Sequence, residues 1–165
     1  MMSSTENRQA LPAPLAAHLA PTARNIASAA MAVAKLASSG WQPLCGYPGA
    51  DTHWHVRCLV CGQWDGLKFY SHLRRGKPAF RHPGCLPEAQ RTAKLAEITA
   101  ALSTACPCPA AHPVTAEDAA EAIREVSRAR DEGDEDALSA QLARLLGRCP
   151  AAAARAEAVQ AAASA

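Results

Sequence analysis

Apolar residues recur at helical spacing near the start of the chain. Thr22 can cap such a helix, and the Ser-Ser-Gly sequence at 38–40 ends it. The pattern predicts an amphipathic helix over residues 23–38, after a polar, Pro- and Ala-rich segment, residues 1–21, that is expected to be disordered. Four residues make the apolar face of this helix: Ile26, Ala30, Val33 and Ala34.

Helical patterns return in the second half of the chain. Pro87 suits the first position of a helix over 87–102. Thr115 and Asp118 resemble a capping box and predict a helix over 115–132. A third, Ala-rich helix is expected at the C-terminus, so that the tail forms a helical hairpin or small bundle. Between the helix over 115–132 and this Ala-rich helix, leucines at helical spacing predict one more helix: Leu138, Leu142, Leu145 and Leu146.

The segment 41–85 differs in kind from its surroundings. It holds all seven aromatic residues of the chain and four of its six histidines, enough for a small aromatic-lined core. Short strands are predicted around Trp54–Arg57 and Gln63–Trp64. For Leu67–Arg75 the pattern leaves a short helix and a hairpin arm both open.

Composition limits the size of the core. The chain has 165 residues, of which 49% are hydrophobic but only 4% aromatic. Much of the hydrophobic fraction is alanine, which buries little area, so a small domain of this kind needs a staple such as a metal ion. The chain has seven cysteines from which such a site could be built.

The net charge of +2 conceals an uneven distribution. Residues 51–94 carry eight Lys and Arg against three Asp and Glu, a net charge of +5. Residues 113–165 carry six against ten, a net charge of −4. We therefore expect a basic centre and an acidic tail.

Four residues have the spacing of paired zinc ligands. Cys58 and Cys61 form a C-x2-C pair followed by a glycine, and His82 and Cys85 repeat the x2 spacing around a Pro-Gly turn. Two such turns at hairpin distance can bring four ligands to one point. We expect one structural Zn²⁺, with all four positions filled by the protein and none left for a catalytic water.

The sequence around these ligands contains four stretches of a recognisable pattern: Gly40-Trp41-x-Pro43-Leu44-x-x-Tyr47-Pro48-Gly49-Ala50, Trp54-x-x-Arg57-Cys58-x-x-Cys61-Gly62, Leu73-Arg74-x-Gly76 and His82-x-x-Cys85. Over residues 23–95 they resemble the small treble-clef or zinc-ribbon modules of bacterial, notably actinobacterial, and phage proteins. Such modules often accompany nuclease-like or other nucleic-acid-handling proteins. The resemblance implies a bound metal and suggests contact with nucleic acid. It does not point to any enzymatic activity. These modules usually have four cysteines, and His82 stands in place of one.

Other cysteines and histidines give weaker alternatives. A redox role for the C-x2-C pair lacks the surrounding βαβ pattern, and Cys45 is expected to be a small packing residue. His53, His55 and His72 raise the alternative of an HNH-type nuclease, but with His82 assigned to zinc they do not complete the ligand set of a catalytic cation. A second Cys3His set also stays open, although C-x-C with interleaved prolines is a poor chelating turn: Cys106, Cys108, His112 and Cys149.

Basic and aromatic residues alternate in and next to the predicted finger. Such a cluster can bind phosphates without sequence preference, and Trp64, Phe69 and Tyr70 could stack on bases, with DNA favoured over RNA. The alternative is that the cations only offset the thiolate charge and the aromatics form the core. The candidate nucleic-acid-binding residues are Arg57, Lys68, Arg74, Arg75, Lys77 and Arg81.

A protein-interaction adaptor is the second hypothesis, in which the finger is a rigid scaffold and the helices of 115–165 supply the binding face. The N-terminus has no signal-peptide pattern, and no apolar run is long enough to span a bilayer. We therefore expect a cytoplasmic protein whose thiols stay reduced, with no membrane partner and no small-molecule substrate. The competing interpretation is an exported protein with paired cysteines.

Together these patterns predict an α+β fold: a small treble-clef or zinc-ribbon-like finger with short β-hairpins, flanked by α-helices, and a mostly helical C-terminal tail. The expected divisions are a disordered tail at 1–21, a helix with the finger and its following helix at 22–103, a Cys/Pro-rich hinge at 104–114 and an acidic helical unit at 115–165.

Overall fold

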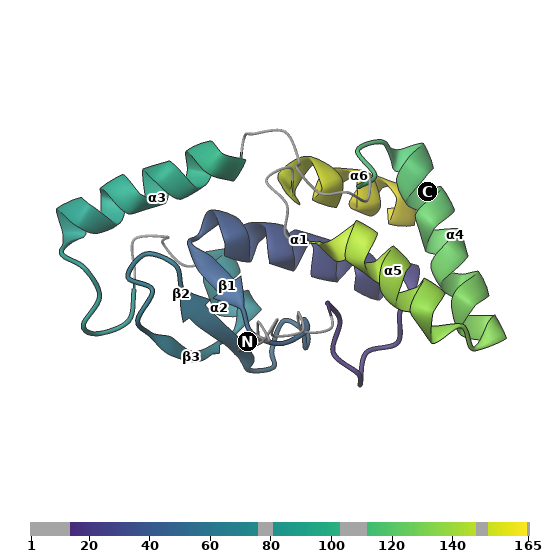
Figure 1. The fold of residues 1–165 in the computed structure, drawn as a ribbon, viewed down its shortest axis with the longest axis horizontal. Coiled ribbons are helices and arrows are strands. Elements are labelled where there is room, and N and C mark those ends of the chain that lie inside the picture. The colour runs from purple at the N-terminus through teal and green to yellow at the C-terminus, as the bar shows by residue number, and fades with distance from the viewer. Residues whose placement is uncertain (1–13, 76–80, 103–111, 148–151, 165) are drawn as a thin grey trace, which may run out of the picture.

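The computed structural model describes residues 14–75, 81–102, 112–147 and 152–164. Within these ranges the fold is α+β and mostly helical, with six helices and one three-stranded antiparallel sheet. Figure 1 shows α1 running through the middle, with the sheet and α2 on one side and α4, α5 and α6 toward the other. In chain order the elements are α1 Ala23–Ser38, β1 Trp41–Pro43, β2 Trp54–Cys58, β3 Asp65–Lys68, α2 Tyr70–Arg75, α3 Glu88–Leu102, α4 Ala116–Glu132, α5 Glu135–Leu146 and α6 Ala152–Ser164.

Helix α1 begins and ends where the sequence predicts. The Thr22 hydroxyl accepts a hydrogen bond from the backbone N–H of Asn25, which satisfies one of the free donors of the first turn. After the last turn the chain reverses at Gly40, whose φ of +76° favours glycine. The predicted face is confirmed at Ile26, Ala30 and Val33, and it widens to include further residues: Ala29, Ala32 and Leu36.

The sheet has the order β1-β2-β3, and β2 alternates between buried and exposed side chains. The first predicted strand is confirmed as β2, which runs on to Cys58, whereas the second lies one to two residues later than predicted, at β3. For Leu67–Arg75 the sequence left a short helix and a hairpin arm open, and the structure contains both. Strand β3 ends at Lys68, and helix α2 begins at Tyr70. Strand β1 was not predicted, since three residues are too few for an alternation to show.

Residues 14–21 correct the expectation of a disordered tail over 1–21. The backbone N–H of Ala16 donates to the carbonyl of Tyr47, and the N–H of Tyr47 donates to the carbonyl of Pro14. Leu15 is buried in the main core, and the His18 ring bonds the carbonyl of Pro48. An apolar leucine with a sheet-like partner is therefore enough to fix this segment, while residues 1–13 lie outside the described ranges.

Helix α4 has the N-cap that the sequence predicts, and α5 has one that it did not predict. The Thr115 hydroxyl accepts from the N–H of Asp118 at the start of α4, and Gly133 ends that helix with a φ of +70°. The Asp134 carboxylate caps α5 by accepting from the N–H of Ala137. The leucine stripe of α5 faces the core, with Leu142, Leu145 and Leu146 buried and Leu138 half-buried.

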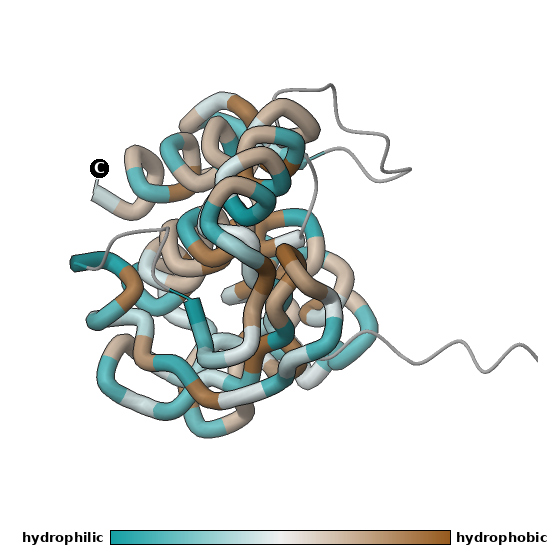
Figure 2. The backbone as a smooth tube through the Cα atoms, turned by 90° about the vertical axis from the view of Figure 1, so that its left-hand side faces the viewer, coloured by the Kyte–Doolittle hydropathy of each residue, from teal (hydrophilic) through white to brown (hydrophobic). Residues whose placement is uncertain are grey.

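The core crosses the boundary expected at 104–114. Helix α1 packs against α5 and α6 and also against β1 and α2. One cluster of buried side chains contains residues of the sheet, of α1 and of the three last helices. Figure 2 shows hydrophobic and hydrophilic residues alternating along the helices, as expected where each helix turns one face inward. The acidic helices are therefore not a separate bundle with a core of their own.

Helix α3 is confirmed at its predicted position and packs only lightly, against α1. The side chains of residues 88–101 are exposed or half-buried, and Leu95 reaches Gly40 after the end of α1. In Figure 1 it projects to one side of the molecule. None of the helices in the described ranges has the length and apolar character that crossing a membrane requires.

We predict that Leu145→Ala lowers the free energy of unfolding by about 2–5 kcal/mol, because Leu145 is fully buried and its removal leaves a cavity. The matched control is Leu67→Ala on β3, where the side chain is 55% exposed and the expected change is within about 0.5 kcal/mol. Denaturant unfolding at a fixed excess of zinc measures both. Equal, small effects would show that the leucine stripe is not in the core.

Candidate metal centre

The first pair of ligands lies on the turn between β2 and β3. Strand β2 ends at Cys58, whose carbonyl accepts a hydrogen bond from the N–H of Gly62 at 2.9 Å. Gly62 has a φ of +70°, so the chain can reverse at once after Cys61. The N–H of Cys58 donates to the carbonyl of Trp64 at 2.8 Å and closes the hairpin. This tight turn places both thiols on the same side.

The second pair lies on the turn between the undescribed residues 76–80 and α3. His82 and Cys85 flank a Pro-Gly sequence in which Gly84 has a φ of +79°. The N–H of Leu86 donates to the thiol of Cys85. Each turn therefore has two residues between its ligands and a glycine in the left-handed conformation, which follows the second ligand in the first turn and precedes it in the second.

The two turns meet. The ligand atoms of Cys58, Cys61, His82 and Cys85 all lie within 4.8 Å of one another. The sulfur atoms of Cys58 and Cys85 are 3.9 Å apart, and the Cys61 sulfur is 3.3 Å from Nε2 of His82. Around a tetrahedral ion bonded to sulfur at about 2.3 Å, two sulfurs lie about 3.8 Å apart. These four residues could therefore hold one metal ion, as their spacing predicts.

His82 presents the correct nitrogen to this group. Its Nδ1 lies 2.9 Å from the carbonyl of Pro83, and a carbonyl only accepts, so Nδ1 carries the proton. The lone pair of Nε2 is then free to face a metal ion. The Trp64 ring stacks on the imidazole at 4.6 Å between centroids and an interplanar angle of 6°, which fixes the orientation of the ligand.

Gly66 makes room for Trp64. A Cβ atom built on Gly66 would lie 2.1–2.9 Å from three atoms of the Trp64 ring, closer than any real contact. A strand position normally favours a larger residue, so this glycine is explained by the ring that covers it. The stacking of Trp64 on the ligand His82 therefore depends on a glycine at position 66.

The Cys58 thiol lies in a site that favours its ionised form. Burial raises its pKa, but hydrogen bonds from Arg81 and from the N–H of Cys61, together with the neighbouring His82 ring, outweigh burial and lower the pKa to about 6. Burial raises the pKa of Cys85, and the neighbouring Cys58 sulfur adds to this, although the N–H of Leu86 opposes it. Thiols this close resist joint ionisation, and a divalent cation between them would remove that conflict.

Arg81 is not the surface residue that the sequence suggested. It was expected to bind nucleic acid, but it is only 6% exposed and its guanidinium lies 3.8 Å from the centre of the Trp41 ring. Its Nη2 donates to the Cys58 sulfur at 3.0 Å. A count of charges along the chain does not distinguish a buried cation from an exposed one, although the position beside His82 was a signal of this contact.

The other expected nucleic-acid residues have different surroundings. Arg57 is exposed, but its guanidinium pairs with Asp65 across the hairpin at 2.8 Å. Lys68 is half-buried, with its Nζ 5.1 Å from the Trp41 ring and 5.5 Å from the Trp64 ring, and burial lowers its pKa. Lys77 lies outside the described residues.

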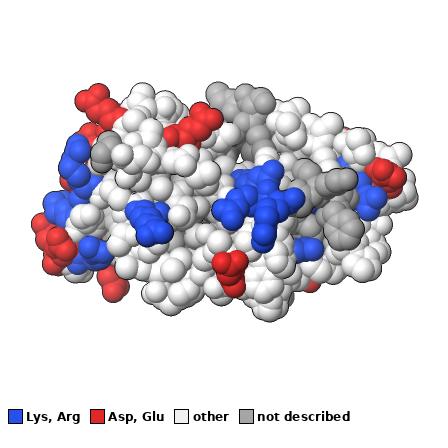
Figure 3. Space-filling view, turned by 180° about the vertical axis from the view of Figure 1, so that it is seen from behind, with Lys and Arg blue, Asp and Glu red and all other residues white. Residues whose placement is uncertain are grey.

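Arg74 and Arg75 stand on the surface at the end of α2. The Arg74 guanidinium lies 5.8 Å from the Tyr70 ring, and Arg75 Nε donates to the carbonyl of Ser71. Figure 3 shows a group of basic side chains near the middle of the rear face. We call Arg74, Arg75 and the exposed His72 of the same turn the α2 basic surface.

Most aromatic side chains belong to the core and are not available for stacking. Trp41, Tyr47, Trp54 and Tyr70 are each at most 6% exposed. Trp64 is half-buried and stacks on His82, and Phe69 is half-buried as well. Phe69 lies between two exposed histidines, His53 at 4.4 Å and His72 at 5.1 Å between ring centroids.

The alternatives gain little support from the described residues. Within these ranges the only group of three or more metal-binding side chains is the one at Cys58, so His53, His55 and His72 do not form a second. Of the other Cys3His set only His112 is described; its Nδ1 lies 2.6 Å from the carbonyl of Arg144, and its buried Nε2 has no partner in the described part of the chain. Cys106, Cys108 and Cys149 lie outside the described ranges. Cys45 is half-buried against the core, which fits a packing residue.

We predict that Cys58→Ser and Cys85→Ser each abolish binding of a single transition-metal ion, because each removes one of four ligands. Elemental analysis of reduced protein should give about one ion per chain in the wild type. Cys45→Ser is the matched control, since Cys45 lies outside the group, and it should retain the ion. A wild-type content near zero would contradict the site, and a content near two would direct attention to the second Cys3His set.

We also predict that Gly66→Ala weakens metal binding by displacing Trp64 from His82. The loss should be about ten-fold, the lower range for groups that support a ligand. A double-mutant cycle with Trp64→Leu tests the cause, because Gly66→Ala should cost much less once the ring is gone. Equal effects of Gly66→Ala in both backgrounds, measured by chelator competition, would refute the ring contact as the cause.

No family model matches this sequence, and neither a curated protein nor a solved structure matches it. The resemblance to treble-clef and zinc-ribbon modules therefore stays a prediction, and the case for the site rests on the geometry of its four ligands.

Proposed function

We propose that this protein is a zinc-stabilised, non-enzymatic binding protein whose finger, residues 41–86, contacts nucleic acid. The observation that carries the proposal is the convergence of Cys58, Cys61, His82 and Cys85 within 4.8 Å. Three thiolates and one imidazole in a small, closed site suit Zn²⁺ better than harder ions, which prefer oxygen ligands. Four protein ligands leave no open position for a substrate or a catalytic water, so the proposed role of the metal is structural.

The sheet of the finger is too small to be stable without further support such as a metal ion. Its strands are three to five residues long, and a short hairpin of this kind is marginally stable by itself. The aromatic side chains pack on the inner face of the sheet, and the outer face is open, with Leu67 exposed. Joining the two ligand turns would hold the surface of the finger, including α2, in one shape.

The α2 basic surface is the part of the finger that best suits nucleic acid. Arg74 and Arg75 are exposed, and within the described residues no carboxylate pairs with either of them. Guanidinium groups bind phosphate oxygens in a bidentate manner, and Phe69 with its two histidines offers rings beside them. Cationic contacts to phosphate carry no sequence information, so we propose binding through the nucleic-acid backbone with little sequence preference, and to DNA in the first instance.

The second candidate is an adaptor that binds a protein partner through residues 115–165. The leucine stripe cannot be its binding face, because those leucines pack in the core. The feature that favours an adaptor is the turn from α4 to α5, where residues 131–136 are all exposed and five of the six are acidic. This face would suit a basic partner.

We predict that the double substitution Arg74→Ala/Arg75→Ala weakens binding to generic duplex DNA. Losing two phosphate contacts should reduce the slope of log K against log salt by about 0.9 per contact. Fluorescence anisotropy with labelled DNA over a salt series measures the affinity and the slope in the zinc-loaded protein.

The matched control is Arg128→Ala/Arg130→Ala on α4, which removes the same charge from a different part of the surface. An equal loss in both double variants would mean that only the net charge matters, against a role for the α2 basic surface. If the zinc-loaded wild type binds neither DNA nor RNA, the nucleic-acid proposal fails, and the adaptor is the better account.

A further inference from the structure

Arg81 joins the metal centre to the end of helix α1. It is a buried cation that precedes the ligand His82 by one residue. Its Nη2 donates to the Cys58 sulfur at 3.0 Å and to the carbonyl of Gly40 at 2.8 Å, and its Nη1 donates to the carbonyl of Ser39. These carbonyls are 41 and 42 positions away along the chain. One guanidinium therefore contacts a candidate ligand and the corner that follows α1.

The two carbonyls lie at the end of helix α1 and just after it. Ser39 is the C-cap of α1, and Gly40 is the left-handed residue after it. Carbonyls at this end carry the negative pole of the helix, and a cationic side chain that bonds them stabilises the helix terminus. Arg81 supplies this cap from outside the helix, while the Gly40 carbonyl also accepts the N–H of Leu59 on the first ligand turn.

The charge of the proposed centre requires a neighbour of this kind. Three thiolates and one Zn²⁺ carry a formal charge of −1, and Arg81 is the buried cation in contact with one of the sulfurs. A buried guanidinium without an anionic partner is unfavourable, so Arg81 and the thiolate stabilise each other in the interior. Lys68 is the second cation nearby, but its Nζ lies over the Trp41 and Trp64 rings.

We propose that Arg81 is a positioning residue that couples metal occupancy at Cys58 to the ordering of the α1–β1 corner, residues 38–41. With the metal in place the Cys58 thiolate is fixed, and Arg81 is held where it caps α1. Without the metal Arg81 loses a fixed anion, and the corner loses its external cap. Because α1 also packs against α5 and α6, this corner lies where the finger joins the helical side of the molecule. The inference rests on the proposed zinc centre.

Amide hydrogen exchange on the full chain loaded with Zn²⁺ tests the coupling. The informative amides are those of Ser39, Gly40 and Leu59, whose hydrogen bonds define the corner. In Arg81→Met we expect these amides to exchange about ten-fold faster or more than in wild type, while amides of α4 and α5 keep their protection. The matched control is Arg57→Met, which removes an exposed, paired guanidinium from the same sheet and should leave the corner unchanged.

Two readouts separate positioning from mere packing. Arg81→Met should lower zinc affinity by about ten- to hundred-fold, the range for residues that bond a metal ligand, and Arg81→Lys should restore part of it by returning the charge. With Co²⁺ in place of Zn²⁺, the sulfur-to-cobalt charge-transfer band should shift in Arg81→Met but not in Arg57→Met, because the Cys58 sulfur loses a hydrogen-bond donor. Wild-type affinity and wild-type corner exchange in Arg81→Met would overturn the coupling.

Chelation keeps the test decisive if Arg81→Met does not fold. Removing zinc from the wild type should expose the amides of Ser39 and Gly40 before those of α4 and α5. Unchanged protection at the corner would again overturn the coupling. A wild type that binds no metal ion overturns the zinc centre and the coupling together, whereas a wild type that binds one ion with an uncoupled corner overturns the coupling alone.

Discussion

The meeting of two distant turns at one group of ligands is the constraint on which the finger depends. The Cys58 and Cys85 sulfurs come together across 27 positions of the chain, and Cys61 and His82 across 21. Three short strands cannot enforce that closure alone, because a small sheet with one open face buries too little apolar area. The side chains that orient the ligands, Trp64 and Arg81, are also those that tie the turns to the sheet and to α1.

Helix α1 provides the wall that the finger and the C-terminal helices share. Its buried residues Ala29, Ala30 and Ala32 are fully inaccessible, and α6, which packs against α1, also buries alanines. A small side chain buries little area by itself, but it lets two helix backbones approach closely and gain dispersion contacts along their length. Composition therefore underestimated the size of the core, since an alanine-rich chain can still build one continuous core.

The sequence predicted what local chemistry determines. The Thr22 and Thr115 caps, the Ser-Ser-Gly end of the first helix and the x2 spacing within each ligand pair act over a few residues, and each was confirmed as a structural feature. The meeting of the two ligand pairs was also predicted, but the surroundings of Arg81 depend on other distant partners and were not. Arg81 looks like any other basic residue of the finger until the Ser39 and Gly40 carbonyls, over forty positions away, are seen to surround it. The same holds for the packing of α1 against α6.

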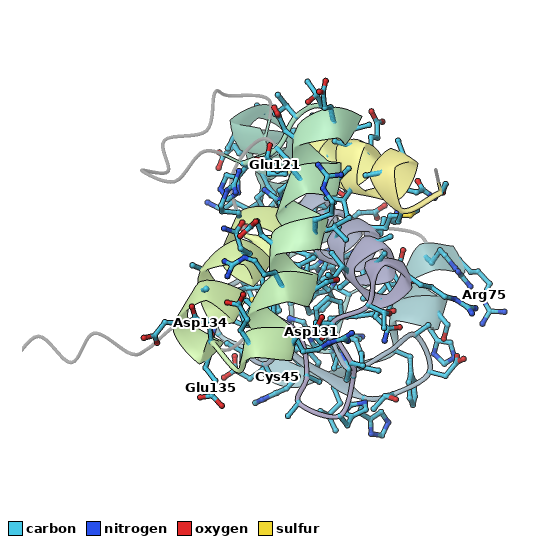
Figure 4. The ribbon with its side chains drawn as sticks, turned by 90° about the vertical axis from the view of Figure 1, so that its right-hand side faces the viewer. Cys45, Arg75, Glu121, Asp131, Asp134 and Glu135 are labelled. Carbon is cyan, nitrogen blue, oxygen red and sulfur yellow. The ribbon has the colours of Figure 1, made fainter. Side chains whose placement is uncertain are left out.

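The arrangement of charge also bears on how the molecule would approach a polyanion. Figure 4 shows Arg75 on one side of the molecule and Asp134 and Glu135 on the opposite side. The acidic turn therefore does not cover the α2 basic surface in this structure. A molecule with a net charge of +2 but opposite charges at its two sides experiences a torque as well as an attraction near a line of phosphates. In the proposed complex with nucleic acid, that torque would turn the acidic helices away and the finger inward, so that the tail would orient binding without touching the nucleic acid.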